Sequence, residues 1–153
     1  MKLGEALSLL RKEKSRLARI ISLRKENVYI YEDEKATFDP NELGKEIDKK
    51  IENIRKLKIK IQKTNRDITL NGGDISLAEA IIKVGDIRSK ISSLSSLFEK
   101  KRDSWIYREK EGKKKIDQID EQKVEEEIEE LENEKSQLDS KIQIANWTSQ
   151  LID

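Results

Sequence analysis

Aliphatic residues recur every three or four positions along four stretches of this 153-residue chain. In residues 2–25 the row consists of Leu3, Leu7, Leu10, Leu17 and Ile21, with Lys14 interrupting it. This spacing places the side chains on one face of an α-helix. A helix of about 25 residues is close to 40 Å long. The pattern therefore predicts long amphipathic helices.

Two of the other helices have clear start signals. Asp39-Pro40-Asn41-Glu42 combines an N-cap aspartate, a proline at the first helical position and a glutamate three residues after the cap. Ser76-Leu77-Ala78-Glu79 has the form of a capping box. The second helix is expected to persist to Asn65 and the third to end near Arg102. The fourth is expected to begin at about Glu121.

Each of these three helices has an apolar row. The second carries Leu43, Ile47, Ile54, Leu57 and Ile61, widened by Ile51. The third carries Ala80, Val84, Ile87, Ile91, Leu94 and Phe98. The fourth has the clearest heptad pattern, with Val124, Ile128, Leu131, Leu138, Ile142 and Ala145, and with Lys135 as its polar interruption.

Short β-prone pieces lie between the helices. Residues 68–75 are expected to form a hairpin closed by Asn71-Gly72-Gly73-Asp74, and residues 28–31 and 105–107 also favour strands. We therefore predict an all-α fold, namely one domain over residues 1–153. Its form is an elongated antiparallel four-helix bundle with small β-hairpin elaborations at its ends. The alternative is a pair of coiled-coil hairpins whose apolar rows are completed by other copies.

The chain has no cysteine and no histidine. This excludes disulfides, thiolate nucleophiles, imidazole bases and the common zinc ligands. The remaining carboxylates, lysines and tyrosines form no recognisable catalytic arrangement, so we expect no enzyme and no cofactor. Acidic runs such as residues 125–127 and 32–34 could bind a divalent cation. The favoured interpretation is that these carboxylates are solvated on the surface.

Two features of the sequence bear on the location of the protein. The N-terminal stretch has Glu5 within its short apolar part, and no run approaches the ~20 apolar residues of a membrane helix. A soluble cytoplasmic protein without membrane contact is expected. The acceptor motif Asn146-Trp147-Thr148 would then not be glycosylated.

Net charge is only +1, but the charges are segregated. Residues 117–139 hold eleven acidic residues and two lysines, whereas residues 45–66 hold nine basic and three acidic residues. One hypothesis is nucleic-acid binding by the basic residues Lys56, Lys58, Lys60, Lys63 and Arg66. We favour the other, in which the acidic fourth helix lies beside the basic first and second helices of the same or a neighbouring chain.

Aromatic residues provide candidate packing anchors. Trp105 and Tyr107 are expected to close the apolar end of the bundle. Near the chain end, Ile144, Trp147 and Leu151 form a second row beside Asn146. We predict that Trp147 docks beside the start of the first helix and the Asn71-Gly72 hairpin. Its replacement by alanine would cost about 3–5 kcal/mol if the ring were fully buried.

Several stretches together are similar to a known family: MKLGEALSLLRKEKSRL, DPNEL, SLAEAIIKVGDIRSKISSL and, above all, LDSKIQIANWTSQL. They resemble a small family of uncharacterised prokaryotic proteins labelled "septicolysin". The similarity spans nearly the whole chain. The resemblance implies an all-helical fold with self-association and supplies no catalytic residues.

These observations favour a non-enzymatic protein that works by self-assembly as a homo-oligomer of undetermined copy number. Apolar residues outside the main rows motivate this prediction, namely Leu9, Ile20, Leu23 and Ile59. One alternative is a nucleic-acid-associated or toxin–antitoxin-type accessory protein that uses the basic helices. Another is the membrane-damaging cytolysin that the family label suggests.

Overall fold

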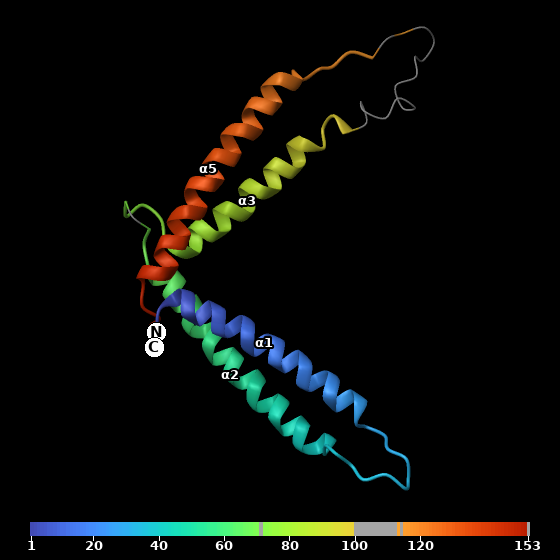
Figure 1. Ribbon diagram of the computed structural model, residues 1–153. Coiled ribbons are helices and arrows are strands. Elements are labelled where there is room, and N and C mark those ends of the chain that lie inside the picture. Colours follow the sequence, from blue (N-terminus) through green and yellow to red (C-terminus); the bar gives the residue numbers. More distant parts are fainter. Residues whose placement is uncertain (71, 100–112, 114, 153) are drawn as a thin grey trace. The chain divides into compact units, whose positions relative to one another are not determined.

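The computed structural model describes residues 1–70, 72–99, 113 and 115–152 (Figure 1). These residues form four α-helices and no sheet: α1 (Leu3–Glu26), α2 (Pro40–Asp67), α3 (Leu77–Ser95) and α5 (Glu121–Thr148). The all-α prediction is confirmed. The chain divides into two compact units, Met1–Ile68 with Ile144–Asp153, and Thr69–Gln143.

In the first unit, α1 packs along α2 (Figure 1). Leu3 and Ala6 of α1 are fully buried, and most of the predicted residues of α2 are buried: Leu43, Ile47, Ile54 and Ile61. The predicted α1 row is wrong at two positions. Ile21 is 48% exposed, and Ile20 is the partly buried residue. From Leu17 the row can step by three or four residues, and the position of α2 selects three.

The second correction concerns the polar position in this row. Glu13, rather than Lys14, lies in the contact between α1 and α2. Its carboxylate accepts from Lys50 Nζ of α2 at 2.9 Å and from Arg16 Nη1 at 2.8 Å. The Glu13 and Lys50 side chains are only 19% and 20% exposed. The hydrogen bond from Lys50, followed by that from Arg16, lowers the pKa of Glu13.

Both predicted helix starts are confirmed. The Asp39 side chain accepts from Asn41 N at 2.8 Å, with Pro40 at the first turn of α2. At α3, Glu79 N donates to Ser76 Oγ at 3.2 Å and Ser76 N donates to Glu79 Oε2 at 2.7 Å. These bonds satisfy amide groups that have no partner within the helix. The bond from the Ser76 backbone, followed by that from its hydroxyl, also lowers the pKa of Glu79.

In the second unit, α3 pairs with α5 (Figure 1). Lys83 Nζ lies 2.7 Å from Glu134 Oε1, and Lys90 Nζ lies 2.7 Å from Glu127 Oε1. The numbering rises along α3 while it falls along α5, so the two helices are antiparallel. Among the described residues, these ion pairs join the acidic helix to α3, whereas the sequence had suggested the first and second helices.

The core of this unit lies between the two helices. Buried residues are Leu70, Leu77, Ala80, Val84, Ile87, Val124 and Ile142. Six further members of the predicted rows are only partly buried, namely Ile91, Leu94, Phe98, Ile128, Leu131 and Leu138. α3 ends at Ser95 and not near Arg102. Serines favour such an end because their hydroxyls bond to nearby carbonyls, as Ser96 Oγ does to Ser93 O at 2.9 Å.

The predicted β-hairpin elaborations are wrong for the part of the chain that the structure describes. The described residues on either side of position 71 form no strand, and a single bridge joins Thr69 to Ser76. Leu70 N donates to Ile75 O at 3.1 Å, and Gly72 and Gly73 have φ angles of +119° and +78°, which glycine adopts readily. Residues 28–31 form no strand. Residues 105–107 lie outside the described residues.

We expect Glu13→Gln to lower the urea midpoint of unfolding at neutral pH. Because the folded pKa of Glu13 is lowered, its ionised form stabilises the fold above the ordinary value of 4.5. This stabilisation is lost as the pH falls through the lowered pKa. The difference between the Glu13→Gln and wild-type midpoints should therefore shrink in acid. Glu46→Gln, an exposed change on α2, is the control. A difference that stays constant with pH would contradict this assignment.

Candidate functional site

The first and last residues of the described chain are bonded to each other in the first unit. Leu3 N donates to Ser149 O at 3.0 Å and Leu151 N donates to Met1 O at 2.9 Å. Lys2 Nζ donates to Thr148 O at 2.9 Å. Carbonyls at a helix C-terminus lack partners within the helix and carry partial negative charge. The beginning of α1 therefore caps the end of α5. We call these bonded residues, 1–3 and 148–152, the terminal clamp.

The terminal clamp continues to α2. Ile152 N donates to Thr64 Oγ1 at 2.9 Å, and the same hydroxyl donates to Lys60 O at 2.8 Å. Thr64 is fully buried. A buried hydroxyl that both donates and accepts leaves little polar desolvation cost. Thr64 therefore fixes Ile152 to α2. The sequence does not predict this contact, because a lone threonine carries no periodic signal.

Trp147 lies across Gly4 at the start of α1. A Cβ built on Gly4 would approach Trp147 Cδ2 to 2.9 Å, so only glycine leaves room for the ring. The ring is nevertheless 57% exposed. Full burial, the condition on which the expected stability cost depended, is therefore not met. The ring covers backbone instead of filling a cavity. The predicted neighbour Asn71 lies outside the described residues.

The other residues of the terminal row divide between core and surface. Asn146 is buried at 9% exposure and Leu151 is partly buried, whereas Ile144 is 51% exposed. Ile144 and Trp147 thus form an apolar surface on the last turns of α5. The predicted anchors Trp105 and Tyr107 lie outside the described residues.

The loop between α1 and α2 carries the most exposed aromatic residues of the described chain. Tyr29 is 89% and Tyr31 76% exposed, and Val28, Ile30 and Phe38 are also exposed. We call residues 28–38 the tip segment. From the sequence, residues 28–31 are expected only to favour a strand. The missed signal is the concentration of aromatic and aliphatic residues in a loop between two complete helices.

The apolar residues on which the prediction of self-association rests differ in their exposure. Leu9, Ile20 and Leu23 are each partly buried within the first unit. Ile59 is 47% exposed. The surplus apolar surface of the first unit therefore lies mainly at the tip segment and around Trp147.

The candidate nucleic-acid contacts do not form one row. At about 100° per residue, Lys56, Lys60 and Lys63 share a face of α2, whereas Lys58 lies on another side. Lys56 pairs with Glu52 at 2.7 Å and Arg66 with Asp67 at 2.7 Å. These bonds lower the pKa values of Glu52 and Asp67. Much of the positive charge is therefore compensated locally.

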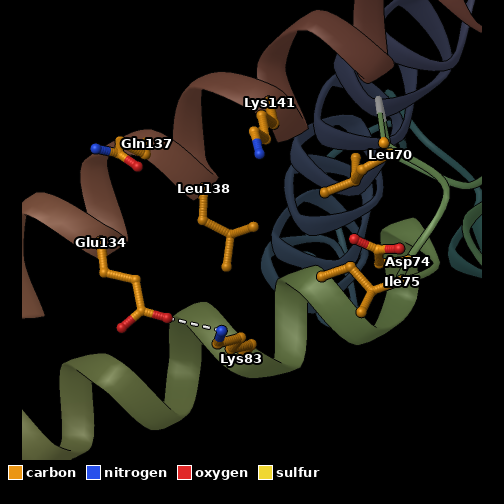
Figure 2. Close-up of a pocket in the computed structure, with 9 residues that line it drawn as sticks. Leu70, Asp74, Ile75, Lys83, Glu134, Gln137, Leu138 and Lys141 are labelled. Carbon is orange, nitrogen blue, oxygen red and sulfur yellow. Dashed lines mark ion pairs between the residues drawn. The ribbon is translucent and has the colours of Figure 1, made fainter.

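A cavity of about 290 Å³ lies in the second unit (Figure 2). Its apolar wall comes from Leu70, Ile75 and Leu138. Its polar wall holds the paired side chains of Lys83 and Glu134, together with Asp74, Gln137 and Lys141. Two lysines face two carboxylates, so the formal charges of the lining cancel. The cavity offers hydrogen bonds to a small polar molecule but no excess charge that would select one.

In the part of the chain that the structure covers, no three acidic side chains converge as metal ligands would. No helix within the same ranges has the length and apolar character needed to cross a membrane.

The model of a family of unknown function, DUF6847, matches residues 11–151, so the chain belongs to this family. A solved structure described as a functionally unknown conserved protein from Corynebacterium diphtheriae matches with a TM-score of 0.84. Its sequence identity is 23%, over 99% of each chain, which shows the fold alone. No curated protein matches the chain. Neither of the two descriptions carries the label "septicolysin".

We expect the effect of Gly4→Ala on the free energy of unfolding to depend on the residue at position 147. When Trp147 is replaced by alanine, Gly4→Ala should raise the free energy of unfolding by about 0.5–1 kcal/mol, because alanine favours a helix. With Trp147 present, the new methyl group displaces the ring, and the gain should vanish or reverse.

The measurement is urea unfolding of the four proteins of this double-mutant cycle. Gly85→Ala is the control, because a Cβ there would meet nothing within 4 Å. It should give the same change with and without Trp147. Equal effects of Gly4→Ala in both backgrounds would show that the ring does not rest on Gly4.

Proposed function

We propose that this member of DUF6847 is a non-enzymatic, cytoplasmic protein that works by self-association as a homo-oligomer. The observation that carries the proposal is the exposure of Tyr29 and Tyr31 at the tip segment. Exposed apolar surface of this kind is typical of contact sites, and tyrosine is enriched among residues that dominate binding energy.

The two tyrosines of the tip segment are largely exposed in the first unit. Tyr29 and Tyr31 are two of only three tyrosines in the chain, and both lie within a loop of a highly charged protein. An aromatic side chain buries roughly 150–250 Å² when covered. Covering these rings with another protein surface would gain burial that the first unit alone does not provide.

The chemical inventory supports a non-enzymatic role. The chain lacks histidine and cysteine, the usual bases and nucleophiles at neutral pH. The cavity beside Lys83 and Glu134 has both groups engaged with each other at 2.7 Å. Absence of cysteine is also compatible with a reducing cytoplasm.

Two other functions are less well supported. The nucleic-acid hypothesis needs uncompensated charge, whereas Lys56 and Arg66 each pair with a neighbouring carboxylate. The cytolysin suggested by the family resemblance would release dye from loaded liposomes. Both are measurable beside self-association, as retention of DNA at low salt and as leakage.

We expect light scattering after size-exclusion chromatography to give a mass above the 17.8 kDa of one chain, rising with protein concentration. Because the proposed contact is largely apolar, the mass should persist at high salt, which screens charge pairs between copies. A mass of one chain at every concentration up to several hundred micromolar would overturn self-association. Leakage or DNA retention by such a monomer would support the corresponding alternative.

A further inference from the structure

We propose that residues 28–31 of two copies pair as antiparallel strands about a two-fold axis at Tyr29. This inference rests on the proposed self-association and names its surface, its partner and its register. The partner is a second copy of the same chain.

The backbone of this segment is available for pairing. Among the hydrogen bonds of the described residues, none is donated by the main-chain N–H groups of residues 28–31. Tyr31 O accepts from Glu34 N at 3.0 Å, which closes the turn that follows. Valine, tyrosine and isoleucine favour strands, and an unpaired segment of this composition is a template for strand addition.

The charges on both sides of the segment favour an antiparallel arrangement of identical chains. Arg24, Lys25 and Glu26 precede it with a net charge of 2 − 1 = +1, and Glu32, Asp33, Glu34 and Lys35 follow it with a net charge of 1 − 3 = −2. Two antiparallel copies bring the basic side of each toward the acidic side of the other. A parallel arrangement would bring like charges together. Such complementarity selects orientation more than it adds affinity.

Symmetry restricts the register to a few choices. Residues that lie directly opposite each other share a face of the sheet, and faces alternate along a strand. A two-fold axis therefore passes beside a residue that faces its own copy, such as Tyr29 or Ile30. An axis at Ile30 would set Tyr29 against Tyr31 but also the apolar Val28 against the charged Glu32. An axis at Tyr29 sets Val28 against Ile30 and no apolar residue of the segment against a carboxylate, so this pairing of side chains favours Tyr29.

The side chains of the segment also offer a place for the partner. Tyr29, Ile30, Tyr31 and Glu34 line a hollow of about 380 Å³ in the first unit. The two-fold axis would bring the second Tyr29 to this hollow. The surface is small beside the roughly 800 Å² that each partner contributes to a standard interface. Association through it is therefore expected to be weak and concentration-dependent.

The absence of cysteine makes a cross-linking test clean. Residues directly opposite in an antiparallel pair have Cβ atoms about 4.5–5.5 Å apart, close to the reach of a disulfide. We expect Tyr29→Cys to form a covalent dimer under mild oxidation at least about tenfold faster than Ser8→Cys, because only the first faces its own copy. Ser8 is exposed on α1 and reports random collision. Faster cross-linking by Ile30→Cys than by Tyr29→Cys would overturn the register.

A charge exchange tests the same pairing with both tyrosines intact. Lys25→Glu should weaken association at least about threefold, and adding Asp33→Lys to it should restore most of the loss. The matched neutral control is Lys25→Gln combined with Asp33→Asn. This double variant should not restore association at low salt to the wild-type level. No rescue, with Tyr29→Cys no faster than Ser8→Cys, would overturn the inference.

These outcomes separate the inference from the proposed function. A wild-type protein that oligomerises while Tyr29→Cys cross-links only at the collision rate would retain self-association and reject the tip segment as its surface. A wild-type protein that stays monomeric, without preferential cross-linking, would reject both.

Discussion

The terminal clamp is the interaction on which the first unit depends most. The end of a long helix leaves carbonyls without partners, and the start of another leaves amide groups without partners. Here Leu3 N and Lys2 Nζ, at the start of α1, satisfy Ser149 O and Thr148 O at the end of α5. The buried hydroxyl of Thr64 adds a bond to Ile152 N. Residues that are furthest apart in sequence are thereby placed together. The exposed ring of Trp147 then packs on Gly4.

The features that local chemistry determines could be predicted from the sequence. Asp39 and Ser76 cap helices because each helix start needs acceptors for its own amide groups, which neighbouring residues provide. The features that depend on a second helix were less accessible. Ile20 and Ile21 both fit the periodic row, and only the packing of α2 shows that Ile20 is the partly buried one. Glu13 is seen to lie between α1 and α2 only because Lys50 of α2 pairs with it.

The candidate surfaces show a similar division. Composition alone excluded imidazole and thiol chemistry. The degree of exposure did not follow from residue type, because Trp147 rests on backbone at Gly4 and Tyr29 extends from a loop with nothing over it. Hydrophobicity indicates that a side chain gains from being covered. Whether its own chain covers it is a property of tertiary structure.

The pairing of α3 with α5 shows how a helix with many similar acidic residues can still pair with its partner in a single register. Lys83 and Lys90 meet Glu134 and Glu127. A slip of about one turn in one direction would set these lysines against Leu138 and Leu131. A slip in the other direction would set Lys90 against Lys123. The few residues that interrupt the run of carboxylates therefore fix the register of the two helices, because each of them makes a shifted pairing unfavourable.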